Sequence, residues 1–121
     1  MTPSEVTVLT VASSTRVRLG MPDLGAYSIA TYDIVDRDQF QKYPPVVHSL
    51  FPKYGGDVLA SDTSAVLVEG SVRTMNAIIQ FPSREAALGL YNDPAYQEAK
   101  CNRQASTTNV SMVLVDEFDM R

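Results

Sequence analysis

Histidine, cysteine and tryptophan are almost absent from this sequence. It contains one histidine, one cysteine and no tryptophan among 121 residues. Because Cys101 has no second cysteine to pair with, the chain forms no internal disulfide. One histidine and one cysteine also leave too few ligands for a Cys/His zinc site. We therefore expect no bound metal.

Long apolar runs are absent too. No run approaches the roughly 20 residues that a transmembrane helix needs. The first residues show no basic stretch followed by an apolar block, the pattern of a secretory signal. We expect a cytoplasmic protein that has no membrane partner.

Basic residues are outnumbered by acidic ones. Ten Lys and Arg against fourteen Asp and Glu give a formal net charge of −4, which argues against nucleic acid as a partner. A glycine-rich phosphate loop, a serine nucleophile elbow and a histidine pair are all missing, and these absences exclude several large enzyme classes. With 45% hydrophobic and 20% charged residues, the chain has the composition and length of one globular domain.

The first 24 residues differ from the rest of the chain. They are rich in Ser and Thr and contain no aromatic residue, although residues 6–11 (VTVLTV) have the composition of a strand. We expect residues 1–24 to form a flexible N-terminal arm or an extra strand, and residues 25–121 to form the folded domain.

The first half of the domain predicts a strand followed by an interrupted helix. Residues 26–34 mix aromatic and β-branched side chains, as strands do. Asp36 with Gln39 three residues later is typical of a helix start. The proline pair at 44–45 predicts a kink or a second helix that begins at a proline, and Gly55 suits a left-handed helix end.

The second half repeats the alternation of strands and helices. We expect a strand at 57–61 and 65–70, in one or two pieces, and a further strand at 74–81. A helix capped by Ser83 follows, and another helix restarts at Asp93 and Pro94 and ends near Ser106. The last strand is expected at 110–118.

The resulting order, β-α-β-β-α-β, predicts an α+β, ferredoxin-like fold with an antiparallel sheet and helices on one face. The last strand is apolar on both sides, with Met112 and Leu114 opposed to Val113 and Val115. The chain has no spare element to cover the second face, so we expect a homodimer.

Three sequence blocks resemble a known family: KYGG at 53–56, FPSREAA at 81–87 and YNDPAYQ at 91–97. Together they are similar to the domain of unknown function 1330 family, over residues 25 to 118. The resemblance implies the dimeric α/β-barrel superfamily, in which two ferredoxin-like sheets pack face to face. That superfamily includes quinol monooxygenases, muconolactone isomerases and cyclases, most of which work without a metal or bound cofactor.

His48 and Arg103 are two candidate catalytic residues. Histidine is the side chain whose unperturbed pKa lies nearest to neutrality. His48 lies on the flank of the first helix, where it is either a general base at a pocket mouth or a solvent-edge or dimer-contact residue. Arg103 follows Tyr96 on a helix face toward the sheet, and there it can clamp a carboxylate or enolate. Its structural alternative is an ion pair with an acidic side chain such as Asp93, Asp116 or Glu69.

Asp33 and Glu69 are the other two candidates for catalysis. We expect both within strands, where a carboxylate in an apolar cavity can abstract a proton next to a carbonyl. The alternative is a strand-edge carboxylate in water or paired with Arg73 or Arg103.

Five further side chains are candidates for substrate binding. Tyrosine offers an apolar body and a hydroxyl, and an amide can polarise a carbonyl oxygen. The set is Tyr27, Tyr43, Asn76, Tyr91 and Tyr96.

Two functions are compatible with these features. The first is a small cofactor-independent enzyme that acts on an aromatic or polyketide-like molecule by isomerisation, cyclisation, elimination or oxidation, as in biosynthetic tailoring. The second is a dimeric small-molecule-binding or accessory protein without catalysis. The first predicts an apolar pocket with a few converging polar groups, and the second predicts no enclosed pocket or one without a perturbed ionisable group.

Overall fold

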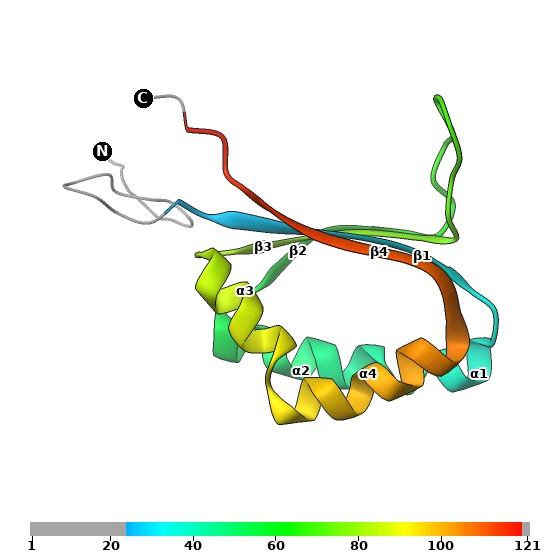
Figure 1. Cartoon of the computed structure of the whole chain (residues 1–121), viewed down its shortest axis with the longest axis horizontal. Helices are drawn as coiled ribbons and strands as arrows, with labels where there is room; N and C mark the ends of the chain where they lie inside the picture. Colours follow the sequence, from blue (N-terminus) through cyan, green and yellow to red (C-terminus); the bar gives the residue numbers. More distant parts are fainter. Residues whose placement is uncertain (1–23, 120–121) are drawn as a thin grey trace.

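The computed structural model describes residues 24–119 and contains one four-stranded sheet with all of its helices on one face (Figure 1). Apart from Leu24, the arm or extra strand expected for residues 1–24 lies outside the described residues. The elements are β1 (Ala26–Ile34), α1 (Arg37–Phe40), α2 (Pro44–Tyr54), β2 (Asp57–Asp62), β3 (Met75–Phe81), α3 (Arg84–Tyr91), α4 (Pro94–Ser106) and β4 (Thr107–Asp116). No helix within residues 24–119 is long and apolar enough to cross a bilayer.

The strands are ordered β2-β3-β1-β4, and every neighbouring pair is antiparallel. This confirms the predicted ferredoxin-like β-α-β-β-α-β arrangement, with the two helical regions crossing the same face. Ala30 in the central strand β1 lies between Ala77 of β3 and Met112 of β4, so these three positions share the helix-facing side.

Helices start and stop where the local sequence predicts. The side chains of Asp36, Ser83 and Asp93 each accept a backbone N–H of the following first turn. The proline pair starts a second helix at Pro44. Gly55 ends that helix in the left-handed region at φ 72°, and a Cβ there would lie 3.0 Å from a proline ring carbon.

Asp93 also ties the start of α4 to the end of α2. Its carboxylate accepts hydrogen bonds from the Tyr54 hydroxyl at 2.6 Å and from the Lys53 ammonium at 3.0 Å, besides capping its own helix. The Tyr54 and Lys53 hydrogen bonds, with the backbone bond of the cap, lower the pKa of Asp93 to about 2. The helix pair is thereby fixed over the sheet.

The segment between β2 and β3 departs from the prediction. Residues 65–70 were expected to be strand, but β2 ends at Asp62, whose side chain accepts the backbone N–H of Ser64 at 2.7 Å and turns the chain. Residues 63–74, here called the β2–β3 arm, leave the sheet and project away from the helices (Figure 1). β4 also begins three residues earlier than expected, at Thr107, because it follows α4 without a loop.

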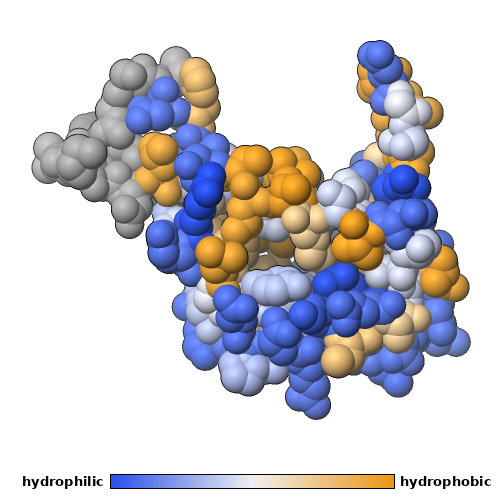
Figure 2. All heavy atoms as spheres, in the orientation of Figure 1, coloured by the Kyte–Doolittle hydropathy of each residue, from blue (hydrophilic) through white to orange (hydrophobic). Residues whose placement is uncertain are grey.

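The core lies between the sheet and the helices, and the opposite sheet face is uncovered. Phe40, Phe51 and Phe81 belong to the buried cluster on the helix side. Val113 and Val115 on the second face of β4 are 49% and 38% exposed, so a single chain does not bury the strand that is apolar on both sides. In Figure 2 apolar side chains gather along the sheet beside the arm, and the surface below them is hollowed toward the helices.

Candidate functional site

A cavity of about 660 Å³ lies between the helix-facing side of the sheet and the helices. This volume is in the range of small-molecule sites. Its walls come from all four strands on one side and from the helices α1 to α4 on the other, and they are mostly aliphatic or aromatic. None of the described residues that line it is Asp or Glu. The only permanently charged residue among them is Arg103.

Arg103 is buried without a counter-charge. It is 3% exposed, and its Nε has no hydrogen-bond partner. Its guanidinium carbon lies 5.7 Å from the ring centroid of Tyr43. Among the ion pairs of residues 24–119, none includes Arg103. The acidic partners considered for it from the sequence, Asp93 and Asp116, pair instead with Lys53 and Arg84.

The charge of Arg103 is retained in this setting. Burial lowers the pKa of Arg103, but the phenol groups of Tyr96 and Tyr43 together raise it by a larger amount, so the net shift of the pKa is upward. An arginine with an unused N–H donor in an apolar cavity is a ready partner for a carboxylate, phenolate or enolate oxygen.

Tyr43 and Tyr96 form a hydroxyl pair beside Arg103. Their oxygens are 2.9 Å apart, and their rings meet edge to face at 5.9 Å. Burial, followed by the charge of Tyr96, raises the pKa of Tyr43 well above its ordinary value. Burial also raises the pKa of Tyr32, another lining residue, to about 12. Tyr32 and Tyr43 therefore stay protonated at neutral pH and act as hydrogen-bond donors, not as bases.

His48 and Tyr91 line the outer part of the same cavity. His48 is exposed on α2, and its ring lies 5.3 Å from that of Phe51. Tyr91 is half-exposed and stacks at 5.2 Å on Tyr96, while the Lys100 ammonium lies 4.9 Å from the Tyr91 ring centroid. The entrance thus carries a titratable imidazole and a nearby cation.

Five of the nine candidate site residues meet at this cavity. They are His48, Arg103, Tyr43, Tyr91 and Tyr96. Three more, Asp33, Tyr27 and Asn76, lie on the opposite face of the sheet, because they alternate with the helix-facing residues of β1 and β3. Glu69 lies in the exposed β2–β3 arm and not in a strand, contrary to the sequence-based expectation.

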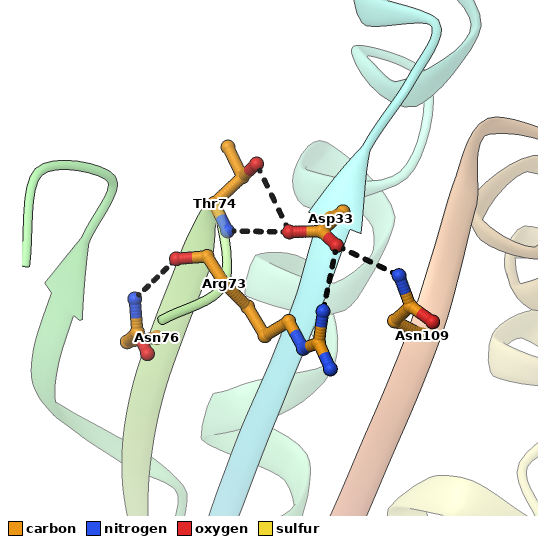
Figure 3. Close-up of polar contacts among 5 residues, drawn as sticks. All are labelled: Asp33, Arg73, Thr74, Asn76 and Asn109. Carbon is orange, nitrogen blue, oxygen red and sulfur yellow. Dashed lines mark hydrogen bonds and ion pairs between the residues drawn. The ribbon is translucent and has the colours of Figure 1, made fainter. Parts of the chain in front are cut away.

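Asp33 holds together the outer end of the sheet (Figure 3). Its carboxylate accepts hydrogen bonds from the Thr74 backbone N–H at 2.9 Å, from the Asn109 amide at 2.9 Å and from Arg73 at 3.3 Å. The Asn109 bond is the largest of the contacts that lower the pKa of Asp33. Asn76 donates to the Arg73 carbonyl at 3.0 Å. The polar groups of Asp33 and Asn76 are therefore engaged in hydrogen bonds that stabilise this end of the sheet.

Sequence reasoning missed five polar lining residues: Ser28, Tyr32, Ser61, Gln104 and Thr107. Tyr32 could have been found from strand alternation, since it shares a face with Ala30, and Gln104 from its place beside Arg103. Within residues 24–119 no three histidine, cysteine or acidic side chains lie close enough to hold a metal ion.

Comparison with known proteins finds one matching family model and several solved structures of similar fold. The family model described as domain of unknown function, DUF1330, matches residues 25–118. No curated protein matches the sequence. Among solved structures, a protein of unknown function from Rhodopseudomonas palustris, RPA0582, has a TM-score of 0.69 at 16% identity, covering 80% of this chain and 85% of its own.

Two other solved structures are similar in fold. A candidate antibiotic biosynthesis monooxygenase from Caulobacter crescentus has a TM-score of 0.59 at 10% identity, covering 80% of this chain and 92% of its own. A dimeric protein of unknown function with a ferredoxin-like fold, from Bacteroides fragilis, has a TM-score of 0.55 at 9% identity, covering 77% and 96%. At these identities the likeness is one of fold.

Proposed function

The chain belongs to the DUF1330 family, and we propose that it is a small enzyme, working without a bound cofactor, whose substrate is an aromatic or polyketide-like molecule with an enolisable carbonyl or an acidic phenol. The observation that carries the proposal is the buried Arg103, whose Nε has no hydrogen-bond partner, in an apolar cavity whose described lining contains no carboxylate. Such a cavity favours an apolar molecule that bears one negative oxygen.

The common chemical step is the removal of a proton from carbon next to a carbonyl. The neutral imidazole of His48 takes the proton, and the C–H electron pair moves to form the enolate, whose negative oxygen lies at Arg103. The Tyr43 and Tyr96 hydroxyls, 2.9 Å apart, form a second donor set for that oxygen. Reprotonation at another carbon then isomerises the molecule, and attack of the enolate on a second carbonyl cyclises it. Oxidation requires O₂ as the electron acceptor.

The enzyme is proposed to act as a homodimer. The uncovered sheet face presents Ile78, Val113 and Val115, each more than a third exposed. Apolar sheet faces of this kind are normally buried against another layer. A second copy packed face to face supplies that layer, and the Bacteroides fragilis neighbour, which is described as dimeric with a ferredoxin-like fold, supports a dimer.

A second candidate function is ligand binding without turnover. One observation favours it: His48, the only histidine, lies at the exposed rim, while the buried phenol of Tyr43 has a pKa too high for a base. In that case Arg103 binds an anion that leaves unchanged.

Deuterium exchange separates the two functions. With 1,8-dihydroxyanthrone in D₂O under nitrogen, wild type should speed exchange at the methylene carbon, as followed by proton NMR. Arg103→Met should lose about 100-fold of that rate, the usual cost of removing one oxyanion donor. His48→Gln should lose a factor of about 100 or more as the base is removed.

Arg84→Met is the matched control, because Arg84 forms a half-exposed surface ion pair with Asp116 and does not line the cavity. It should keep the wild-type rate. Binding of the anthrone without faster exchange would favour the non-catalytic function, and absence of binding would contradict both.

A further inference from the structure

We propose that the β2–β3 arm of each copy closes the cavity of its partner copy, so that each site is complete only in the dimer. The inference rests on the homodimer of the proposed function but not on its chemistry. The arm comprises the twelve residues 63–74 between β2 and β3. Connections of this length without secondary structure are uncommon in small domains and usually have a function.

The arm exposes a row of branched apolar side chains. Val66 is 85% exposed and Val68 92% exposed, and Leu67 and Val72 are also exposed. Single apolar residues on a surface need no explanation, but a contiguous group on a projecting segment indicates a contact surface. Nothing within residues 24–119 covers it.

The base of the arm is held in place by its own hydrogen bonds. The Asp33 carboxylate accepts from the Thr74 backbone and from Arg73 at the return to β3, and the Asp62 side chain accepts from Ser64 at the departure from β2 (Figure 3 shows the former). A segment that is fastened at both ends loses less conformational entropy when it binds. The hydrogen bonds of Asp33 with Thr74 and Arg73 therefore fix the direction in which the arm leaves the sheet.

The direction and length of the arm determine what it reaches. It projects on the uncovered side of the sheet, away from its own helices (Figure 1). Six extended residues out and six back span roughly 20 Å, whereas two stacked sheets are only about 10 Å apart. An arm of this length therefore passes the partner's sheet and reaches the layer between that sheet and its helices, where the cavity lies.

The rim of the cavity is complementary to the arm. Val58, Leu88 and Val110 line the cavity and are each about half-exposed, so they offer an apolar seat. The arm carries one acidic residue, Glu69, while the described lining has His48 and Arg103 but no carboxylate. Arg73, the other charged residue of the arm, is bound to Asp33 at its base. The projecting part of the arm is therefore apolar and acidic, which suits an apolar cavity whose charged lining residue is Arg103.

Disulfide trapping tests the contact directly. In a Cys101→Ser background, Val68→Cys would be combined with one rim cysteine at a time, Val58→Cys, Leu88→Cys or Val110→Cys, and oxidised chains would be separated on a non-reducing gel. At least one combination should give a covalent dimer. A cysteine placed at the exposed Glu98, which does not line the cavity, is the control and should stay monomeric on the gel.

Subunit mixing tests the consequence for the site, with 1-anilinonaphthalene-8-sulfonate as an anionic aromatic probe. The arm variant Val66→Ser with Val68→Ser and the cavity variant Arg103→Met should each lose most of the probe fluorescence of wild type. When the two are mixed and exchange subunits, about a quarter of all cavities combine an intact Arg103 with an intact partner arm, and about that fraction of the signal should return.

Each failure has a distinct meaning. No cross-link at any rim position, in a protein that sediments as a dimer, overturns the arm contact and leaves the proposed dimer and its chemistry standing. A monomer by sedimentation overturns the contact together with the dimer. Probe fluorescence unchanged in the arm variant, or no recovery on mixing, also overturns the inference, whereas loss of deuterium-exchange activity alone does not bear on it.

Discussion

Replacing Arg103 by Met should make the free protein more stable while removing its affinity for anions. A buried N–H donor without a partner costs about 1–3 kcal/mol, and the Nε of Arg103 is such a donor. Buried charges replaced by apolar side chains of similar volume are often neutral or more stable by about 1–4 kcal/mol. Methionine is flexible enough to fill most of the space that the arginine stem leaves.

The contacts of Arg103 with Tyr43 and Tyr96 oppose this gain. The guanidinium carbon of Arg103 lies 5.7 Å from the ring centroid of Tyr43, and a desolvated cation–π contact is worth about 0.5–2 kcal/mol. The net expectation is a free energy of unfolding higher by about 1 kcal/mol. For a domain of this size that corresponds to a melting temperature higher by roughly 3–6 °C.

Thermal and urea unfolding of the two proteins at one protein concentration measure this difference. Anthracene-9-carboxylate, an aromatic anion, should then raise the stability of wild type by about 2.7 kcal/mol at 100 times its dissociation constant and should leave Arg103→Met unchanged. The control Arg84→Met removes a surface ion pair of 2.7 Å and should lose no more than about 1 kcal/mol.

The reasoning is refuted if Arg103→Met is less stable than wild type by about 2 kcal/mol or more. A loss of that size would mean that Arg103 has a charged partner, which the substitution leaves buried and unpaired. It is also refuted if the ligand stabilises both proteins equally.

Three further outcomes follow from other contacts. Tyr96→Phe removes one oxygen of the hydroxyl pair with Tyr43 and should cost about 1 kcal/mol in urea unfolding, with a smaller loss of anion affinity than Arg103→Met. The pKa of Asp93 is about 2 in the folded chain and 3.8 when unperturbed. The stability that the ionised carboxylate contributes is therefore complete above about pH 4 and is lost as pH falls through 2. The melting temperature of Asp93→Asn should fall less between pH 5 and pH 2 than that of wild type. Gly55→Ala should lose more than about 1 kcal/mol and lose more than Gly70→Ala, because both glycines have positive φ but only Gly55 faces a ring at 3.0 Å; equal melting temperatures of the two variants would contradict the steric argument.

Much of the fold could be read from short stretches of sequence. The helix starts at Asp36, Ser83 and Asp93, the proline that opens α2 and the left-handed Gly55 all depend on neighbours within four residues. Capping and turn chemistry act over that range, so these features needed no knowledge of the rest of the chain. The order of elements then limited the fold to the ferredoxin-like arrangement.

The site residues could be predicted only where the period of a helix determines which of its faces they occupy. Tyr96 and Arg103 lie on the buried side of α4, as their spacing indicates. Asp33 and Asn76 were singled out for their chemistry, although their positions on β1 and β3 alternate with the helix-facing residues and put them on the other side of the sheet. Alternation along each strand, applied against Ala30 as a reference, would have separated them from the cavity.

The sequence by itself determined the order of the elements, the helix caps, the family and which helix face carries Arg103. Only the tertiary structure decided that Arg103 has no counter-charge, that Asp33 is used to fasten the arm, and that residues 63–74 leave the sheet. The physical reason is the range of the interactions. Caps and periodic burial act between residues near in sequence, whereas the partner of a charge depends on groups 40 to 76 residues away, as for Asp33 with Arg73 and Asn109.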